Sequence, residues 1–266
     1  MYDRYNRNIN YLRISVTDRC NLRCVYCMPE RGIIRIKHQD ILSYEEIASF
    51  TKLAVVNGID KVRVTGGEPL IRKNIVYFFR LLSKVGGLKD ISLTTNGILL
   101  ADFARRLKNV GLQRVNISLD TLDPEKYRSI TRGGDITKVM QGIEAAENAG
   151  LYPIKINCVV NTSSAEPDAV RVKAFCESRN LRVRFIHRMN LEAGEYAVVE
   201  GGTGGNCILC NKLRLSSDGN LRPCLFSDLS FNIRKLGAEK AIRMAIEAKP
   251  EYGTRSFQNT FSAVGG

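Results

Sequence analysis

The chain has 266 residues, of which 44% are hydrophobic, so it can bury one sizeable core as a single large barrel or as two domains. Its formal net charge of +13 predicts attraction to an anion, which could be nucleic acid, a membrane surface or a polyphosphate substrate. Because no apolar run approaches the roughly 20 residues that span a bilayer, and the first residues lack the apolar stretch of a signal peptide, we expect a cytoplasmic protein without a membrane partner.

Apolar β-rich runs alternate with helical stretches along the first part of the chain. The runs predicted as strands are 11–16, 61–65, 90–95, 114–119, 154–160 and 182–186. Between them, a predicted helix begins at Ser43, has Glu46 in the capping-box position and ends at Gly58, and a second one ends at Gly150. This alternation predicts a parallel sheet with right-handed crossovers, either as a partial barrel or as an open doubly wound sheet.

The pattern changes after residue 190. Segment 191–206 is rich in glycine and predicts a loop or connection, and a cysteine-bearing segment with a short helix near 237–248 follows it. We therefore divide the chain into an α/β domain at 1–190, a glycine-rich connection at 191–206 and a C-terminal extension at 207–266.

Three cysteines gather in the loop that follows the first predicted strand. Cys20, Cys24 and Cys27 have the spacing CxxxCxxC, and clustered cysteines in a long chain of this kind indicate metal binding. Structural zinc sites usually have paired CxxC motifs and four ligands, and core cysteines have no reason to gather in a polar loop. Three thiolates on a cubane iron–sulfur cluster leave one iron open. The spacing therefore predicts a 4Fe–4S cluster with room for another ligand.

This motif, with Tyr26 before its last cysteine, resembles the signature of radical S-adenosylmethionine (SAM) enzymes. The segment "VTGGEP" follows the second predicted strand and is similar to the glycine-rich turn that lies against the SAM amino group in that superfamily. Gly66 and Gly67 permit close backbone approach. The resemblance implies that SAM occupies the open iron and that its reduction yields a 5′-deoxyadenosyl radical.

A second set of cysteines lies in the C-terminal extension. Cys207 and Cys210 form a CxxC motif, and Cys224 follows after thirteen further residues. The alternative is a zinc ribbon that lacks one ligand or borrows Cys158 or Cys176. These two cysteines lie in a predicted strand and a predicted helix and are interpreted as core thiols. With "CNKLRLSSDGNLRPCLF" around them and a Gly-Gly tail, the C-terminal cysteines resemble those of the GTP 3′,8-cyclase family, also called molybdenum cofactor biosynthesis protein A (MoaA).

The resemblance implies an incomplete (β/α)6 TIM-type barrel with a C-terminal cluster-binding extension. It implies two 4Fe–4S clusters, with SAM on the N-terminal one and GTP on the open iron of the other. The radical would take a hydrogen from the ribose 3′ carbon, and this carbon would then attack carbon 8 of guanine. The product, (8S)-3′,8-cyclo-7,8-dihydroguanosine 5′-triphosphate, would pass to a pyranopterin monophosphate synthase in molybdenum cofactor biosynthesis. An electron donor and a homodimer are also implied, and specific nucleic-acid binding is not.

Matching motifs extend the resemblance to single residues. The positions expected to contact SAM are Tyr26, Gly67, Ser118 and Met189. The positions expected to bind GTP are Arg13, Arg63, Thr94, Lys155, Lys212, Leu213 and Arg214. The positions expected to act in catalysis are Arg13 and, in a tail that reaches into the barrel in this family, Gly265 and Gly266.

The chain also departs from the family pattern. Lys212 replaces a common arginine, which exchanges a planar fork of donors for a point charge. His187 replaces a common glutamate. Met189 and Cys207 are separated by only seventeen residues, where relatives have a longer connection.

Two other functions fit part of the pattern. A radical SAM peptide maturase also carries auxiliary clusters, although its extension usually has more than three cysteines. A basic, non-catalytic metal protein that binds nucleic acid would leave the "GGEP" turn without a role, and the sequence offers no aromatic-rich basic module.

Overall fold

The protein was analysed as a computed structural model that describes residues 1–29, 32–259 and 261. Within these residues one sheet has the strand order β6-β5-β4-β3-β2-β1-β7-β8-β9. Six strands are parallel and lie side by side in the order in which they occur in the sequence. They are β1 (Tyr11–Ser15), β2 (Lys61–Thr65), β3 (Asp90–Thr95), β4 (Arg114–Ser118), β5 (Lys155–Val160) and β6 (Arg182–His187). Each predicted strand is confirmed to within one residue.

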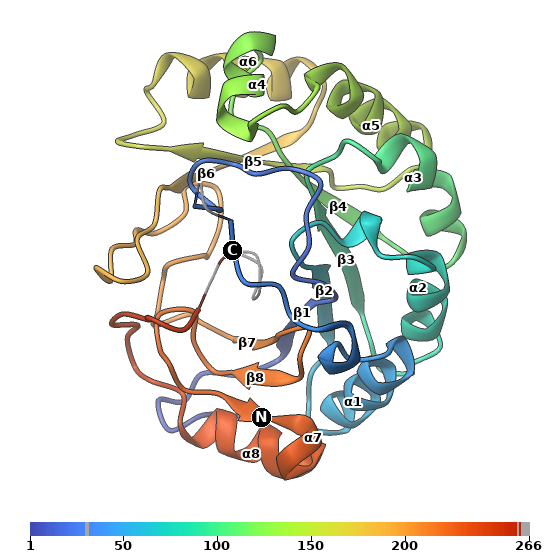
Figure 1. Ribbon diagram of the computed structural model, residues 1–266, viewed down its shortest axis with the longest axis vertical. Coiled ribbons are helices and arrows are strands. Elements are labelled where there is room, and N and C mark those ends of the chain that lie inside the picture. Colours follow the sequence, from blue (N-terminus) through green and yellow to red (C-terminus); the bar gives the residue numbers. More distant parts are fainter. Residues whose placement is uncertain (30–31, 260, 262–266) are drawn as a thin grey trace.

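Helices cover the outer face of this curved sheet (Figure 1). They are α1 (Tyr44–Val56), α2 (Ile75–Ser83), α3 (Leu100–Asn109), α4 (Pro124–Thr131), α5 (Ile136–Asn148) and α6 (Pro167–Ser178), with 3-10 turns at His38–Asp40 and Pro69–Ile71. The predicted capping box is confirmed, because the Glu46 backbone N–H donates to Ser43 Oγ at 3.1 Å and the Ser43 N–H donates to Glu46 Oε2 at 2.7 Å.

The position of these helices decides between the two predicted architectures. A doubly wound sheet carries helices on both faces, whereas here they lie outside an arc of strands, as in an open TIM-type barrel (Figure 1). The expected incomplete (β/α)6 barrel is therefore confirmed. Within the part of the chain that the structure describes, no helix has the length and apolar character needed to cross a membrane.

The C-terminal extension continues the same sheet. Strand β7 (Lys212–Leu215) pairs parallel to β1, and β8 (Asn220–Arg222) and β9 (Phe231–Asn232) add antiparallel strands beyond it. Helix α7 (Ile233–Leu236) and helix α8 (Ala238–Glu247) follow, and α8 confirms the helix predicted near 237–248. The sequence did not predict that these strands join the edge of the barrel at β1.

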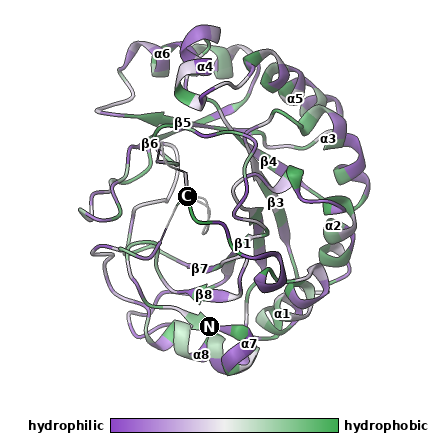
Figure 2. Cartoon of the chain, viewed as in Figure 1, coloured by the Kyte–Doolittle hydropathy of each residue, from purple (hydrophilic) through white to green (hydrophobic). Residues whose placement is uncertain are grey.

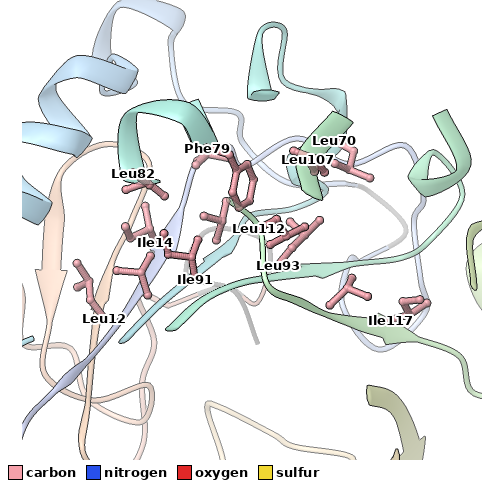
Figure 3. Packing of buried hydrophobic residues seen from close by; sticks show 14 of the residues in the cluster. Leu12, Ile14, Leu70, Phe79, Leu82, Ile91, Leu93, Leu107, Leu112 and Ile117 are labelled. Atoms are coloured by element: carbon pink, nitrogen blue, oxygen red, sulfur yellow. The ribbon is translucent and has the colours of Figure 1, made fainter. Parts of the chain in front are cut away.

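The hydrophobic core lies between the sheet and the outer helices (Figure 3). Leu12 and Ile14 are fully buried in it, and Phe79 of α2 packs into the same cluster. Hydrophobic and hydrophilic residues alternate along the outer helices, so one face of each meets the strands (Figure 2). Since successive strand side chains point to opposite faces, Arg13 between Leu12 and Ile14 faces the barrel interior.

The first residues of the chain tie the barrel to the extension. Buried Arg7 forms an ion pair with Asp3 and donates hydrogen bonds to the carbonyls of Cys207, Pro250 and Glu251 at 2.7 to 2.9 Å. This clamp fixes the loop that carries Cys207 against the N-terminal segment.

Candidate functional site

The barrel interior contains two adjoining cavities. One, of about 180 Å³, is lined by the loops at the carboxyl ends of the strands, and we name it the cysteine cavity. The other, of about 400 Å³, is lined by the amino-terminal halves of the strands and by the extension, and we name it the basic cavity. Asn157, Ile186 and Met189 line both, so the two cavities meet at these residues.

The structure brings the three N-terminal cysteines together on the wall of the cysteine cavity. Cys20, Cys24 and Cys27 all line it and are free thiols. Burial raises the pKa of Cys24 to about 12 and that of Cys27 to about 11, and the charge of neighbouring thiolates adds to both shifts. Because iron binds the thiolate, loading a cluster here must displace these protons.

The "GGEP" turn packs directly against the cysteine loop. The Gly67 N–H donates to the Thr17 carbonyl at 2.7 Å, and the Glu68 N–H donates to the Arg19 carbonyl at 2.8 Å. A Cβ on Gly67 would lie 2.3 Å from Arg19 O, and one on Gly66 would lie 2.7 Å from Thr17 O. The predicted close backbone approach is therefore present, and the neighbour that demands it is the cysteine loop.

Glu68 connects this turn to the end of β3. Its buried carboxylate accepts hydrogen bonds from Thr95 Oγ1 at 2.8 Å, the Asn96 N–H at 2.7 Å and the Leu70 N–H at 3.0 Å. Burial raises the pKa of Glu68 to about 7, although these donors act in the opposite direction. Asn96 also donates to Asn21 Oδ1 at 2.8 Å, so the turns after β2 and β3 both support the loop with the cysteines.

Tyr26 is held by a carboxylate that sequence reasoning missed. Its hydroxyl donates to Asp120 Oδ2 at 2.7 Å, and Asp120 Oδ1 accepts the Val159 N–H at 2.8 Å. Burial raises the pKa of Tyr26, and the charge of Asp120 and the hydrogen bond to it raise it further. Burial also raises the pKa of Asp120, although the hydrogen bonds from Val159 and Tyr26 act in the opposite direction. The "ISLD" segment contained Asp120, but only the fold places it next to Tyr26.

The other residues expected to contact SAM also reach the cysteine cavity. Gly67, Ser118 and Met189 line it. Thr94, which was expected to bind GTP, lines this cavity rather than the basic one, and its buried hydroxyl has no hydrogen-bond partner among the described residues. Phe261 adds a hydrophobic wall and, like Met189, packs against a small buried cluster formed by Leu191, Leu225 and Phe226.

Cations from several strands line the basic cavity. They are Arg13, Lys61, Arg63, Arg114, Arg184, Lys212 and Arg214. Strand register places Arg13 beside both Arg63 and Arg214, because β1 lies between β2 and β7. Burial lowers the pKa of Arg13, and the charges of Arg214 and Arg63 lower it further. Such a concentration of positive charge in a partly buried space favours a multiply charged anion.

The sequence did not single out Lys61, Arg114 or Arg184. Arg114 is held by Asp90 through hydrogen bonds of 2.8 and 2.5 Å, and Asp90 is the one carboxylate residue among the described lining of the basic cavity. Lys61, Arg114 and Arg184 each lie on a short strand with apolar neighbours, as Arg63 does, and this was the feature of the sequence that could have identified them. Their convergence depends on strand register.

Two residues expected to bind GTP lie beside the cavity lining. Leu213 is buried in the hydrophobic core because it alternates with Lys212 and Arg214, so its backbone alone is available to a ligand. Lys155 is half-buried on β5, and burial lowers its pKa to about 8, with further lowering by Arg184 and other nearby cations.

The C-terminal cysteines also converge. Cys207, Cys210 and Cys224 line one end of the basic cavity, and the Tyr196 hydroxyl lies 3.3 Å from Cys207 Sγ. The described residues contain no group of three Cys, His, Asp or Glu placed to hold a single metal ion. The fit of a cluster therefore rests on the shared cavity walls and on the thiol ligands that iron–sulfur clusters use. Cys158 and Cys176 are buried elsewhere, as predicted for core thiols.

The glycine-rich connection forms one side of the basic cavity. Tyr196, Val199 and residues 202–206 line it, and Glu200 pairs with Phe185 of β6 through two backbone hydrogen bonds of 3.1 Å. His187 Nε2 lies 3.7 Å from Glu200 Oε1. The predicted loop thus packs against the edge of the barrel. Gly265 and Gly266 lie outside the described residues.

Comparisons with known proteins agree with this site. Residues 14–163 match the family model of the Radical SAM superfamily. The chain is 43% identical to GTP 3′,8-cyclase of Thermodesulfovibrio yellowstonii over 282 aligned positions, which cover 89% of this chain and 88% of the relative. It is 40% identical to the protein of the same name from Alkaliphilus oremlandii over 299 positions, covering 94% and 93%. The chain belongs to the GTP 3′,8-cyclase family of the radical SAM superfamily.

As a member of this superfamily, the protein uses SAM and a 4Fe–4S cluster. Both alignments are longer than the 266 residues of the chain, so these family relatives contain segments that the chain lacks.

Solved structures show a similar fold at low sequence identity. Native anSMEcpe with bound AdoMet has a TM-score of 0.65 and 18% identity, covering 91% of this chain and 81% of that one. Streptococcus suis SuiB has a TM-score of 0.63 and 16% identity, covering 93% and 67%. At this identity the likeness concerns the fold alone.

Proposed function

We propose that this protein cyclises GTP to (8S)-3′,8-cyclo-7,8-dihydroguanosine 5′-triphosphate, the first step of molybdenum cofactor biosynthesis. One observation carries the proposal: two sets of three thiols open into adjoining cavities, and a row of cations that includes the buried Arg13 and Arg63 faces the barrel interior. The name of the related proteins, GTP 3′,8-cyclase, supports the choice of substrate. A pyranopterin monophosphate synthase would take the product.

In this proposal the cysteine cavity holds the cluster and SAM. Cys20, Cys24 and Cys27 provide the thiolates, and Gly67, Tyr26, Ser118 and Met189 contact SAM. When bound, the cluster and SAM supply a 5′-deoxyadenosyl radical after reduction by an electron donor. The chain orients this chemistry: the glycine turn fixes the cysteine loop, Asp120 fixes Tyr26, and Phe261 helps exclude water.

The basic cavity receives GTP. Arg13, Arg63 and Arg214 form one register row whose guanidinium groups suit the oxygens of a triphosphate. Lys212 adds a point charge, and we add Lys61, Arg114 and Arg184 to the expected set. The triphosphate then lies near the amino ends of the strands. This leaves the nucleoside toward Asn157 and Met189, where the cavities meet.

We assign Cys207, Cys210 and Cys224 to a second 4Fe–4S cluster. Their thiols face the cavity that would hold GTP, so an open iron there would be accessible to the substrate's base. Arg13, together with Gly265 and Gly266 of the tail, would complete the catalytic site.

Arg63→Ala is expected to weaken GTP binding by about 1–3 kcal/mol, or about 5- to 150-fold, because the variant loses a charge-assisted contact inside the cavity. Calorimetric titration with GTP measures the change, and SAM cleavage should remain near the wild-type rate. Arg105→Ala, on the exposed face of α3, is the matched control and should bind GTP normally. Unchanged affinity in Arg63→Ala would move the triphosphate site elsewhere.

GTP affinity should fall as the pH rises above 8. The Lys155 ammonium loses its proton around pH 8 in the free protein, and the triphosphate binds the charged form better. Below its pKa, Lys155 makes its full contribution to GTP affinity. Above that pKa the affinity declines by up to about tenfold per pH unit, until the pH reaches the pKa that Lys155 has in the complex with GTP. Calorimetric titrations with GTP between pH 7 and pH 9.5 test this, because the range spans about one pH unit on each side of the Lys155 pKa.

Lys155→Arg keeps its charge throughout this range and should show a flatter profile than the wild type. If the two profiles coincide, Lys155 does not contribute charge to the GTP site.

One experiment separates the proposed function from its alternatives. The protein is reconstituted anaerobically and incubated with SAM, reductant and GTP, and the nucleotide products are separated. Formation of the cyclic isomer supports the proposal. SAM cleavage without GTP conversion favours a peptide maturase, and absence of SAM cleavage with steeply salt-dependent RNA or DNA retention favours a nucleic-acid protein.

A further inference from the structure

A lysine is buried behind the C-terminal cysteines. Lys249 follows the end of α8, and only 1% of its surface is exposed. Its Nζ donates hydrogen bonds to the carbonyls of Lys212 at 2.8 Å and Pro223 at 2.6 Å. Lys212 lies two residues after Cys210, and Pro223 immediately precedes Cys224. The ammonium thus joins the two chain segments that carry these thiols.

This ammonium lacks a carboxylate partner among the described residues, within the 4 Å that defines an ion pair. Lysine is almost never fully buried unless it is paired. The two carbonyls satisfy two of its three N–H groups but carry no net charge. A buried cation in this position therefore requires an anion nearby.

The available anions are the cysteine sulfurs. Pro223, whose carbonyl accepts from Nζ, is joined directly to Cys224, and one residue separates Lys212 from Cys210. The ammonium therefore lies against the backbone of both segments that carry these thiols, at the end of the basic cavity that Cys210 and Cys224 line. From this position its charge stabilises negative charge on the sulfurs.

We propose that Lys249 is the counter-charge of the C-terminal cluster and a positioning residue that sets its reduction potential. This rests on the proposed second cluster. Three thiolates give that cluster a net negative charge, which grows on reduction. A fixed ammonium in a partly dry site stabilises the reduced state more than the oxidised one, so it raises the potential. Its bonds to Lys212 O and Pro223 O hold the charge at one place between the cysteine segments.

The test compares Lys249→Met, which keeps the aliphatic length and removes the charge, with Lys249→Arg, which keeps the charge. The exposed Lys240→Met on α8 is the matched control. All are made in the full chain with Cys20, Cys24 and Cys27 replaced by alanine, so that the C-terminal cluster is measured alone. Iron is quantified after anaerobic reconstitution, and the reduced fraction is followed by electron paramagnetic resonance in a redox titration.

Lys249→Met is expected to lower the ratio of reduced to oxidised cluster at least tenfold at a fixed solution potential, a shift of about 59 mV for one electron. Lys249→Arg and Lys240→Met should keep a reduction potential near that of the parent chain.

If Lys249→Met no longer retains iron but Lys249→Arg does, the charge is still required, which supports the proposal. An unchanged potential in iron-loaded Lys249→Met overturns it, and so does loss of iron in both Lys249 variants, because shape rather than charge then matters. A parent chain without iron refutes the second cluster itself, which is a separate failure.

Discussion

Replacing Cys20, Cys24 and Cys27 together with alanine is expected to abolish SAM cleavage and to lower the iron content from about eight to about four atoms per chain. The three thiols share the wall of the cysteine cavity, whereas the C-terminal thiols line the basic cavity. Loss of one set should therefore leave the other cluster in place. Iron analysis and assay of 5′-deoxyadenosine after anaerobic reconstitution measure both effects.

The matched controls are the buried thiols. Cys158→Ala and Cys176→Ala remove sulfurs from the core without touching either cavity, so both should retain the full iron content. Iron loss in these variants to the same extent as in the triple variant would contradict the assignment. Tightly bound zinc in the wild type, without iron-dependent absorbance, would contradict it as well.

Gly67→Ala is expected to reduce SAM cleavage at least about tenfold, equivalent to about 1.4 kcal/mol of transition-state stabilisation, and to impair loading of the N-terminal cluster. The added Cβ would lie 2.3 Å from the oxygen and 2.6 Å from the carbon of the Arg19 carbonyl. These are backbone atoms next to Cys20, so relief of the clash must displace the cysteine loop. The measurements are 5′-deoxyadenosine formation, iron content and SAM affinity.

Gly86→Ala provides the control for this substitution. A Cβ at Gly86 meets no atom within 4 Å, so iron content and SAM cleavage should be unchanged. The C-terminal cluster should load normally in both glycine variants. Full SAM cleavage by Gly67→Ala would show that the cysteine loop tolerates the shift and that the tight turn is not required for the reaction.

The strands were predictable because each is a short apolar run with its own local pattern. "KVRVT" and "DISLTT" alternate between residues that enter the core and residues that face the interior, and this period of two can be found without knowing the neighbours. The position of β7 could not be found in this way. Its pairing with β1 joins residues about two hundred positions apart, and nothing local in "KLRL" selects that partner.

The same distinction applies to the site. The spacing of Cys20, Cys24 and Cys27 predicted their convergence, because eight residues of loop keep three side chains within reach of one another. Asp120 and Lys249 carried no such signal. An aspartate after a strand and a lysine after a helix are ordinary exposed residues until the fold buries one against Tyr26 and the other behind Cys210.

The sequence by itself therefore determined the alternation of strands and helices, the two sets of cysteines and the family, since these depend on residue type and on spacing over short distances. The tertiary structure alone decided that Arg13, Arg63 and Arg214 form one row, that Arg184 and Arg114 join them, and that the glycine-rich connection closes the cavity beside β6. The physical reason is that a charge on a strand has no assigned face or neighbour until the strands pair. Register then places distant cations side by side, and their burial together requires an anion.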